Sequence, residues 1–307
     1  HPLRDPGGAD DGGREDDPVA HLHPPVPQGR FPEDPASDAT MNLVLRFSYF
    51  GDRFFGSQVQ PLHRTVEGEF IAAARRLRLF DDPRAAHFAT AGRTDRGVHA
   101  RGQVCSFATD IPERAIARLN RVLPEDIWCT AWTVAPEGFH PRYSAVSRTY
   151  RYYFFPAPEE IAAMHEAVQE FVGLHDFSAF SRAGDKNPLR RILAARVFEE
   201  GPFAVFEVTG ESFLWNMVRC MATALKRVGN GKIDRGAIAL LLACPAGEGL
   251  PAAPPEGLIL WDVEYGFPFT PLPADERSRR YPVGRHRYHM LMAELSARLV
   301  PGEGPPG

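Results

Sequence analysis

The stretch at residues 91–100 reads Ala91-Gly92-Arg93-Thr94-Asp95-Arg96-Gly97-Val98-His99-Ala100, with two guanidinium groups, a hydroxyl and a carboxylate between two glycines. Gly92 and Gly97 permit a backbone turn that residues with a Cβ resist. Arg93 and Asp95 are two positions apart, so in extended backbone they project from the same face. One interpretation is a polar turn with a surface ion pair, since such pairs are common and weak. The other is a charged functional site between apolar strands.

The residues favour the second interpretation through a resemblance. The stretch, continued by Gly102-Gln103-Val104, resembles the catalytic motif of the TruA-type tRNA pseudouridine synthases, Ala-Gly-Arg-Thr-Asp-x-Gly-Val-His-Ala. The resemblance implies that Asp95 is the nucleophile and that Arg93 holds the displaced strand or base of an RNA substrate. Arg96 stands where family members often carry a small residue, and its positive charge suits an RNA ligand.

Two further segments carry the same resemblance. Residues 49–58 are similar to the family's first motif, Tyr-x-Gly-x-x-(aromatic)-x-Gly-(Trp)-Gln, with Ser57 in place of the frequent Trp. Residues 139–145 are similar to Phe-His-Ala-Arg-(aromatic)-Ser-Ala, with Pro141 in place of Ala. A short linker after Phe155 resembles the archaeal form of the family.

Three more residues take roles from the resemblance. Tyr150 falls on the Tyr of the Arg-x-Tyr-x-Tyr motif that contacts the target base, although strand aromatics are more often core residues. Arg219 falls on the Met-Val-Arg motif whose Arg pairs with the catalytic Asp; the alternative is an Arg that extends from a core helix to solvent. Leu258, in a segment similar to Ala-Pro-x-Glu-Gly-Leu, corresponds to the Leu that lines the uracil pocket.

Composition sets outer limits on the class of protein. The 307 residues are 44% hydrophobic and 24% charged, which is ordinary for a globular protein of one large or two medium domains. Four scattered cysteines without a C-x-x-C pair argue against a zinc site and favour a reducing, cytoplasmic setting. No apolar run approaches the roughly 20 residues of a membrane helix, and no signal-peptide pattern opens the chain.

Charge and composition divide the chain into four parts. Residues 1–40 are acidic (a balance of −6) and rich in Pro and Gly, so we expect a disordered leader. The remainder has a balance of +2, which permits RNA binding only through local basic patches. We expect an N-terminal catalytic subdomain at 41–145, a C-terminal subdomain at 146–266 and a basic extension at 267–307.

Periodicity predicts the secondary structure. Strands are expected over 41–49, 103–107, 127–134, 147–155, 192–198, 203–208 and 258–265. Helices are expected after an N-cap at Thr65, from Pro112 to before Pro124, and over 159–172, 213–228, 234–243 and 290–299. Both halves thus combine strands with helices laid on one face. The pattern predicts an α+β fold of two related subdomains, with a mostly antiparallel sheet and a central active-site cleft.

The resemblance implies isomerisation of uridine to pseudouridine at positions 38–40 of the tRNA anticodon stem-loop, by a homodimer. The reaction is redox-neutral and its atoms balance, so it requires no cofactor and no metal. It needs an ionised, desolvated carboxylate, and burial alone would neutralise Asp95 unless an opposite charge such as Arg219 lay beside it. The residues leave open whether Asp95 attacks C6 or C1′. A uridine N-glycosidase and a non-catalytic RNA-binding module are the alternatives.

Overall fold

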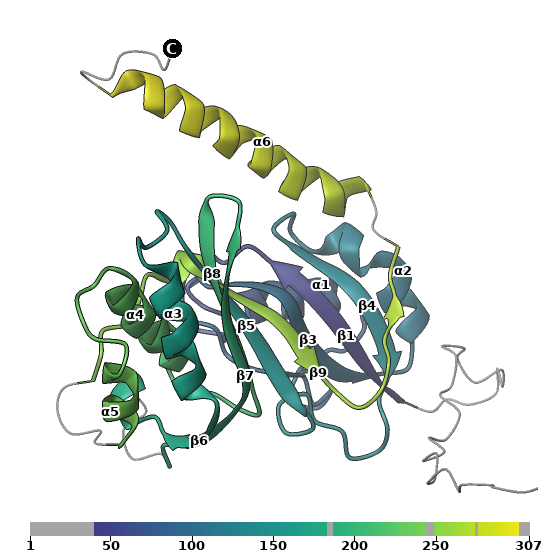
Figure 1. Ribbon diagram of the computed structural model, residues 1–307. Coiled ribbons are helices and arrows are strands. Elements are labelled where there is room, and N and C mark those ends of the chain that lie inside the picture. The colour runs from purple at the N-terminus through teal and green to yellow at the C-terminus, as the bar shows by residue number, and fades with distance from the viewer. Residues whose placement is uncertain (1–39, 183–186, 244–248, 274–275, 301–307) are drawn as a thin grey trace, which may run out of the picture.

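The computed structural model describes residues 40–182, 187–243, 249–273 and 276–300 (Figure 1). The leader expected over 1–40 lies outside these residues, apart from Thr40. Within the described part of the chain, no helix combines the length and the apolar character that crossing a membrane requires.

A ten-stranded sheet forms the centre of the described structure, in the order β10-β4-β1-β3-β9-β5-β8-β7-β6, with β2 paired to β3 off this path. Every pairing is antiparallel except that between β3 and β9. The predicted α+β fold with a mostly antiparallel sheet is therefore confirmed. The strands are β1 (Met41–Tyr49), β2 (Ala89–Thr90), β3 (His99–Thr109), β4 (Ile127–Val134), β5 (Ser147–Phe154), β6 (Gly173–Asp176), β7 (Leu189–Glu200), β8 (Phe203–Gly210), β9 (Leu258–Glu264) and β10 (Thr270–Pro271).

The parallel pair joins the two halves of the chain. Strand β9 lies between β3, which continues the 91–100 stretch, and β5, which carries Tyr150. Ala100 pairs with Leu260, and Leu260 pairs with Tyr150. Sequence segments about 160 and 110 positions apart thus lie on adjacent strands in fixed register.

Five helices cover one face of the sheet: α1 (Val66–Arg76), α2 (Pro112–Val122), α3 (Ile161–Ala167), α4 (Met217–Gly229) and α5 (Ala237–Ala243). On this face Phe70 of α1 packs against Phe47 of β1, with ring centroids 5.1 Å apart. A buried row of Tyr49, Ala100, Leu260 and Tyr150 crosses the middle of the sheet under these helices.

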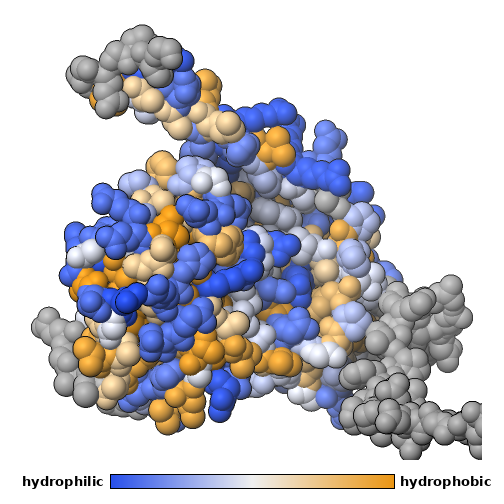
Figure 2. All heavy atoms as spheres, in the orientation of Figure 1, coloured by the Kyte–Doolittle hydropathy of each residue, from blue (hydrophilic) through white to orange (hydrophobic). Residues whose placement is uncertain are grey.

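The opposite face of the sheet is polar. Arg46 pairs with Asp262 at 2.7 Å, and the Arg151 guanidinium lies 3.7 Å from the centroid of the Trp261 ring. Figure 2 shows hydrophilic side chains gathered over the strands in the centre of the view. Along β5, partly exposed Thr149 and Arg151 alternate with buried Tyr150 and Tyr152, so this part of the face needs no helical cover.

Helix α6 (Glu276–Leu299) lies in the C-terminal extension, outside the two halves that form the sheet. It projects away from the body of the molecule (Figure 1). Its first half is fixed to the body by an ion pair between Arg285 and Asp52 at 2.8 Å and by a hydrogen bond from Arg277 to the carbonyl of Arg121 at 2.7 Å. It begins well before the predicted 290–299. The prediction missed its first part because the Arg-rich residues before 290 lack the apolar periodicity that indicates a helix.

In the first half of the chain, the secondary structure predicted from the sequence agrees with the structure. The strands predicted over 41–49, 103–107 and 127–134 and the two helices between them are found as β1, β3, β4, α1 and α2. The Thr65 side chain accepts a hydrogen bond from the backbone N–H of Gly68 at 3.2 Å, as an N-cap should. Three other helices begin or end elsewhere than predicted, and one of them, α5, begins at Ala237 instead of 234. The helix predicted over 159–172 continues after α3 as a 3₁₀ turn (Val168–Phe171), and α4 begins at Met217, so that residues 213–216 form a loop.

The first motif supports the 91–100 stretch through its backbone. A Cβ on Gly51 would lie 2.0 Å from the carbonyl oxygen of Val98. The backbone N–H of Gly51 also donates to Nδ1 of His99 at 2.9 Å. Burial lowers the pKa of His99, which keeps the ring neutral and able to accept this bond. Only glycine allows this close approach.

We predict that Gly51→Ala destabilises the protein by more than about 2 kcal/mol, because the Cβ must displace the backbone at Val98. Gly266→Ala is the matched control, since a Cβ there meets nothing within 4 Å. Urea unfolding of both variants measures the effect. Equal unfolding midpoints for Gly51→Ala and the wild type would contradict the close approach.

Candidate active site

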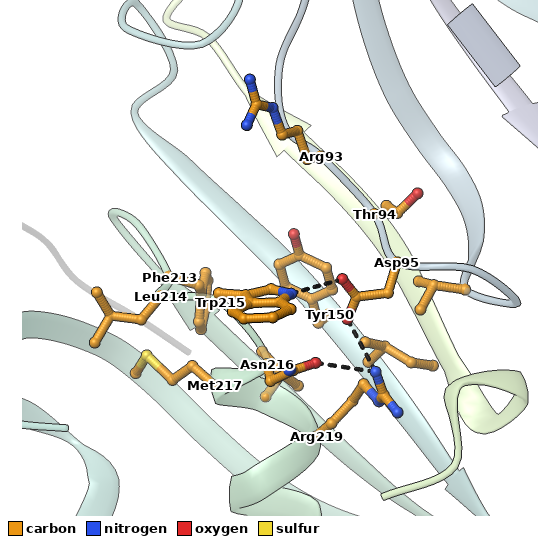
Figure 3. A pocket seen from close by; sticks show the side chains of 13 residues that line it. Arg93, Thr94, Asp95, Tyr150, Phe213, Leu214, Trp215, Asn216, Met217 and Arg219 are labelled. Carbon is orange, nitrogen blue, oxygen red and sulfur yellow. Dashed lines mark hydrogen bonds and ion pairs between the residues drawn. The ribbon is translucent and has the colours of Figure 1, made fainter. Parts of the chain in front are cut away.

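One pocket brings together all five residues to which the resemblance assigned roles (Figure 3). Arg93 and Asp95 enter from the 91–100 stretch, Tyr150 from β5, Arg219 from the first turn of α4, and Leu258 from the start of β9. The loop before α4 completes the lining with Phe213, Leu214, Trp215 and Asn216. The pocket thus lies between the two halves of the chain.

Hydrogen bonds from the first motif hold the turn that carries Asp95. The Ser57 hydroxyl accepts a bond from the backbone N–H of Thr94 at 2.8 Å, and the Ser57 N–H donates to the Thr94 carbonyl at 3.0 Å. The Thr94 and Tyr49 hydroxyls are 2.7 Å apart. Ser57 thus binds the catalytic-motif backbone directly from a position where the family often has Trp, a contact that sequence reasoning missed.

Asp95 and Arg219 form an ion pair, with Arg219 Nη1 2.9 Å from Asp95 Oδ2. The guanidinium is itself fixed, since it donates to the carbonyl of Ala253 at 2.6 Å and to the Asn216 side chain at 3.0 Å. The Asp95 side chain is 31% exposed and that of Arg219 is 15% exposed. The expectation of a fully desolvated carboxylate is therefore wrong for the free protein, because the pocket opens to solvent.

Trp215 binds the other oxygen of the carboxylate. Its indole Nε1 donates to Asp95 Oδ1 at 3.0 Å, although the side chain is 59% exposed (Figure 3). The next residue, Asn216, has a φ of 61°, a left-handed conformation that Asn tolerates better than most residues. The prediction of a helix from residue 213 missed the contact between Trp215 and Asp95, because it placed Trp215 inside the helix. The sequence feature that could have indicated a loop here is an aromatic residue followed by Asn, just before the periodic part of the helix.

Tyr150 lies behind the carboxylate and is 9% exposed. Its ring meets that of Phe213 edge-on at a centroid distance of 5.1 Å. Burial raises the pKa of Tyr150, and the negative charge of Asp95 adds to the effect, so the hydroxyl keeps its proton at neutral pH. In the free protein Tyr150 is therefore a hydrogen-bond donor and an apolar wall.

Leu258 lies in the buried part of the pocket, and Arg93 lies at its exposed rim. Leu258 is 6% exposed and is part of the buried wall. Arg93 is exposed, and its side chain points away from the ion pair (Figure 3). A positive group at the rim and apolar groups inside suit a ligand with a charged backbone and a flat, uncharged ring.

Other chemistry-bearing residues lie elsewhere. Within residues 40–300, gaps excepted, there is no group of three or more His, Cys, Asp or Glu side chains placed to hold a metal ion. Cys105, Cys129 and Cys220 are buried free thiols, and Cys244 lies outside the described residues.

Comparison with known proteins defines the class. A family model described as tRNA pseudouridine synthase matches residues 167–266. The tRNA pseudouridine synthase A of Methanoculleus marisnigri is 73% identical over 85% of this chain and 96% of its own length. That of Methanosphaerula palustris is 48% identical over 86% of this chain and 94% of its own, and that of Thermococcus sibiricus is 42% identical over 73% and 85%.

These matches establish a pseudouridine synthase of the kind that acts on tRNA. The chain belongs to the tRNA pseudouridine synthase A family, and the resemblance found in the sequence is confirmed.

We predict that Trp215→Phe lowers the turnover number for pseudouridine formation by about 5- to 20-fold without changing the thermal midpoint. The variant keeps an aromatic ring but loses the N–H that orients the carboxylate, and a hydrogen bond to a charged group contributes about 1.5–3 kcal/mol before solvent weakens it. Trp128→Phe, in a side chain that does not line this pocket, is the control. A turnover number equal to wild type in Trp215→Phe would rule out a positioning role.

Proposed function

We propose that this protein converts uridine to pseudouridine at positions 38–40 of the tRNA anticodon stem-loop, with Asp95 as the nucleophile. The observation that carries the proposal is the Asp95–Arg219 ion pair in a pocket walled by Tyr150 and Leu258. Membership of the family supplies the reaction and the tRNA substrate.

The target nucleotide has to leave its helical stack to reach the carboxylate. Extrusion of a base costs a few kcal/mol, which enzyme contacts must offset. Arg93 stands at the rim, where it meets the backbone or the displaced base, and the uracil enters between Tyr150, Phe213 and Leu258. These walls are apolar, so they accept the flat face of the ring and exclude water around it.

Arg219 fixes the direction of the nucleophile. Its guanidinium Nη1 lies 2.9 Å from Asp95 Oδ2 and attracts the carboxylate through its opposite charge. Arg219 binds one carboxylate oxygen and Trp215 the other, so the group cannot rotate freely. A bound nucleotide also covers the 31% of the Asp95 side chain that solvent reaches in the free protein, which strengthens the electrostatic interactions in the pocket.

The reaction moves one glycosidic bond. The N1–C1′ bond breaks, the uracil turns within the pocket, and a C5–C1′ bond forms. C5 then loses its proton while N1 gains one, so the product has the composition of the substrate. In this scheme Tyr150 donates a hydrogen bond to the uracil during the turn. Its proton then passes to N1, and the tyrosinate accepts the C5 proton, so Tyr150 ends protonated as it began.

The proposal includes the wider setting. The substrate is tRNA, the active form is a homodimer, and the enzyme works in the cytoplasm, where unmodified tRNA is processed. No cofactor takes part, because no electron is transferred and no atom is gained or lost.

We predict that Asp95→Asn lowers pseudouridine formation by at least about 1,000-fold, because the amide is not a nucleophile. Asp262→Asn is a matched control, since Asp262 is also about one-third exposed and also paired with an arginine. Tritium release from tRNA labelled at C5 of uridine measures the reaction.

The same assay separates the alternatives. A uridine N-glycosidase would release free uracil from tRNA instead of isomerising it. A non-catalytic RNA-binding module would bind tRNA equally well with or without Asp95 and form no product. Equal product from the wild type and Asp95→Asn would contradict the proposed role of the carboxylate.

A further inference from the structure

A second pocket adjoins the first on the other side of Arg93. It has a volume of about 230 Å³, several times the ~30 Å³ share of one water molecule, so it admits a ring-sized ligand. Arg93 lines both pockets, and no other residue of the first pocket does so. A ligand chain that leaves the catalytic pocket past Arg93 therefore enters this second space. Its lining is Gln58, Glu67, Thr90, Gly92, Arg93, His140, Arg142 and Tyr143.

The turn at residues 139–144, part of a motif to which the catalytic scheme gives no role, presents an aromatic and a cationic group to this pocket. Tyr143 is 77% exposed, an unusual position for an aromatic residue with no place in the core. Its ring lies 4.6 Å from that of His140 and 5.8 Å from the Arg142 guanidinium, measured between centroids and to Cζ. With Arg93 opposite, the pocket offers one exposed ring and two guanidinium groups.

Hydrogen bonds make this turn a fixed structure. The N–H groups of Tyr143 and Ser144 donate to the His140 carbonyl at 3.1 and 2.9 Å, and the Arg142 N–H donates to His140 Nδ1 at 3.1 Å. The buried Tyr265 hydroxyl donates to the Pro141 carbonyl at 2.6 Å. The backbone that carries Tyr143 is thus held in place before any ligand arrives.

Arg148 ties the turn to the catalytic stretch. It is 8% exposed, and its Nη2 donates to the carbonyls of Ala91 at 3.0 Å and Arg142 at 2.6 Å. Its Nη1 donates to the carbonyl of Glu211 at 2.8 Å. One buried guanidinium therefore sets the spacing between the two walls of the second pocket and between that pocket and Asp95.

The single carboxylate of the pocket does not oppose an anionic ligand strongly. Glu67 accepts hydrogen bonds from the Thr90 hydroxyl at 2.8 Å and from the Val59 N–H at 3.2 Å. These donors offset part of its charge. Its remaining lone pairs can accept a bond from a ribose hydroxyl or a base amino group.

We propose that this second pocket binds a nucleotide next to the target uridine in the RNA chain, with Tyr143 stacked on its base and Arg142 on its phosphate. The inference rests on the proposed function, because it places the neighbour of a uridine bound at Asp95. Aromatic stacking together with arginine–phosphate contacts is how proteins hold unpaired nucleotides. The neighbour is unstacked when the target is extruded, so a platform for its base offsets part of that cost.

The first test uses protein variants with an anticodon stem-loop RNA. Tyr143→Ala raises the KM by about 5- to 100-fold with little change in kcat, and Tyr143→Phe retains the wild-type KM. Arg142→Ala reduces the slope of log affinity against log salt concentration by about 1. The controls are Phe155→Ala, 69% exposed at the end of β5, and Arg235→Ala, 64% exposed beside Glu166.

The second test removes the partner instead of the protein side chain. Stem-loops are made with an abasic nucleotide immediately 5′ or immediately 3′ of the target. We expect one of these two abasic RNAs to bind the wild type more weakly than intact RNA does. The factor of this loss should be about the same as the factor by which Tyr143→Ala weakens the binding of intact RNA. Tyr143→Ala itself should bind this abasic RNA as well as it binds intact RNA. This non-additivity identifies the base on Tyr143 and cannot arise from a folding defect.

The outcomes separate this inference from the proposed function. If the wild type forms no pseudouridine, the proposed function fails. If it forms product while Tyr143→Ala and both abasic RNAs show only additive changes, the neighbouring-nucleotide pocket is wrong and the proposed function stands. Weaker association between protein copies in Tyr143→Ala, with the KM for RNA unchanged, would instead assign this surface to a protein partner and would likewise overturn the inference.

Discussion

The ion pair between Asp95 and Arg219 is the interaction on which the site depends, since it joins groups 124 positions apart in the chain. The sheet brings these two distant parts of the chain close together in space. Parallel pairing of β3 with β9, and antiparallel pairing of β9 with β5, places the end of the 91–100 stretch one strand away from the strand that carries Tyr150. Helix α4 then brings its first turn, and with it Arg219, to the same pocket. The Asp95 carboxylate thus has an opposite charge beside it and lies in a pocket that Tyr150 and Leu258 also line.

Much of the fold followed from the sequence, because its signals are local. A run rich in apolar, Trp and β-branched residues gave β4 its bounds of Ile127–Val134, and Thr65 and Pro112 marked the starts of α1 and α2. The failures have physical causes. Residues 213–216 are as apolar as the helix that follows, so periodicity could not separate them, and the left-handed Asn216 decides the boundary. The order of strands in the sheet was not predictable, because the β3–β9 pairing brings together residues that are distant in sequence.

The candidate site was likewise predicted only in part from the sequence. The resemblance supplied Arg93, Asp95, Tyr150, Arg219 and Leu258, and the structure places all five at one pocket. The resemblance did not indicate the residues that position other groups through individual hydrogen bonds. Ser57 works through its hydroxyl on the Thr94 backbone, Trp215 through one indole N–H, and Arg148 through three carbonyls from separate segments. None of these contacts has a sequence pattern, since each depends on where the backbone of another segment lies. Arg148 also links the two pockets, because it holds the turn of the second pocket against the stretch that carries Asp95.

The most direct test of this account is a double-mutant cycle on the ion pair, with the free energy of unfolding measured by urea for the wild type, Asp95→Ala, Arg219→Ala and the double variant. Both side chains are only partly buried, so the account predicts a coupling free energy of about 1 kcal/mol, with the double variant less destabilised than the sum of the single ones. Additivity to within about 0.3 kcal/mol would show that the two groups do not interact in solution, and would contradict the claim that Arg219 holds the nucleophile.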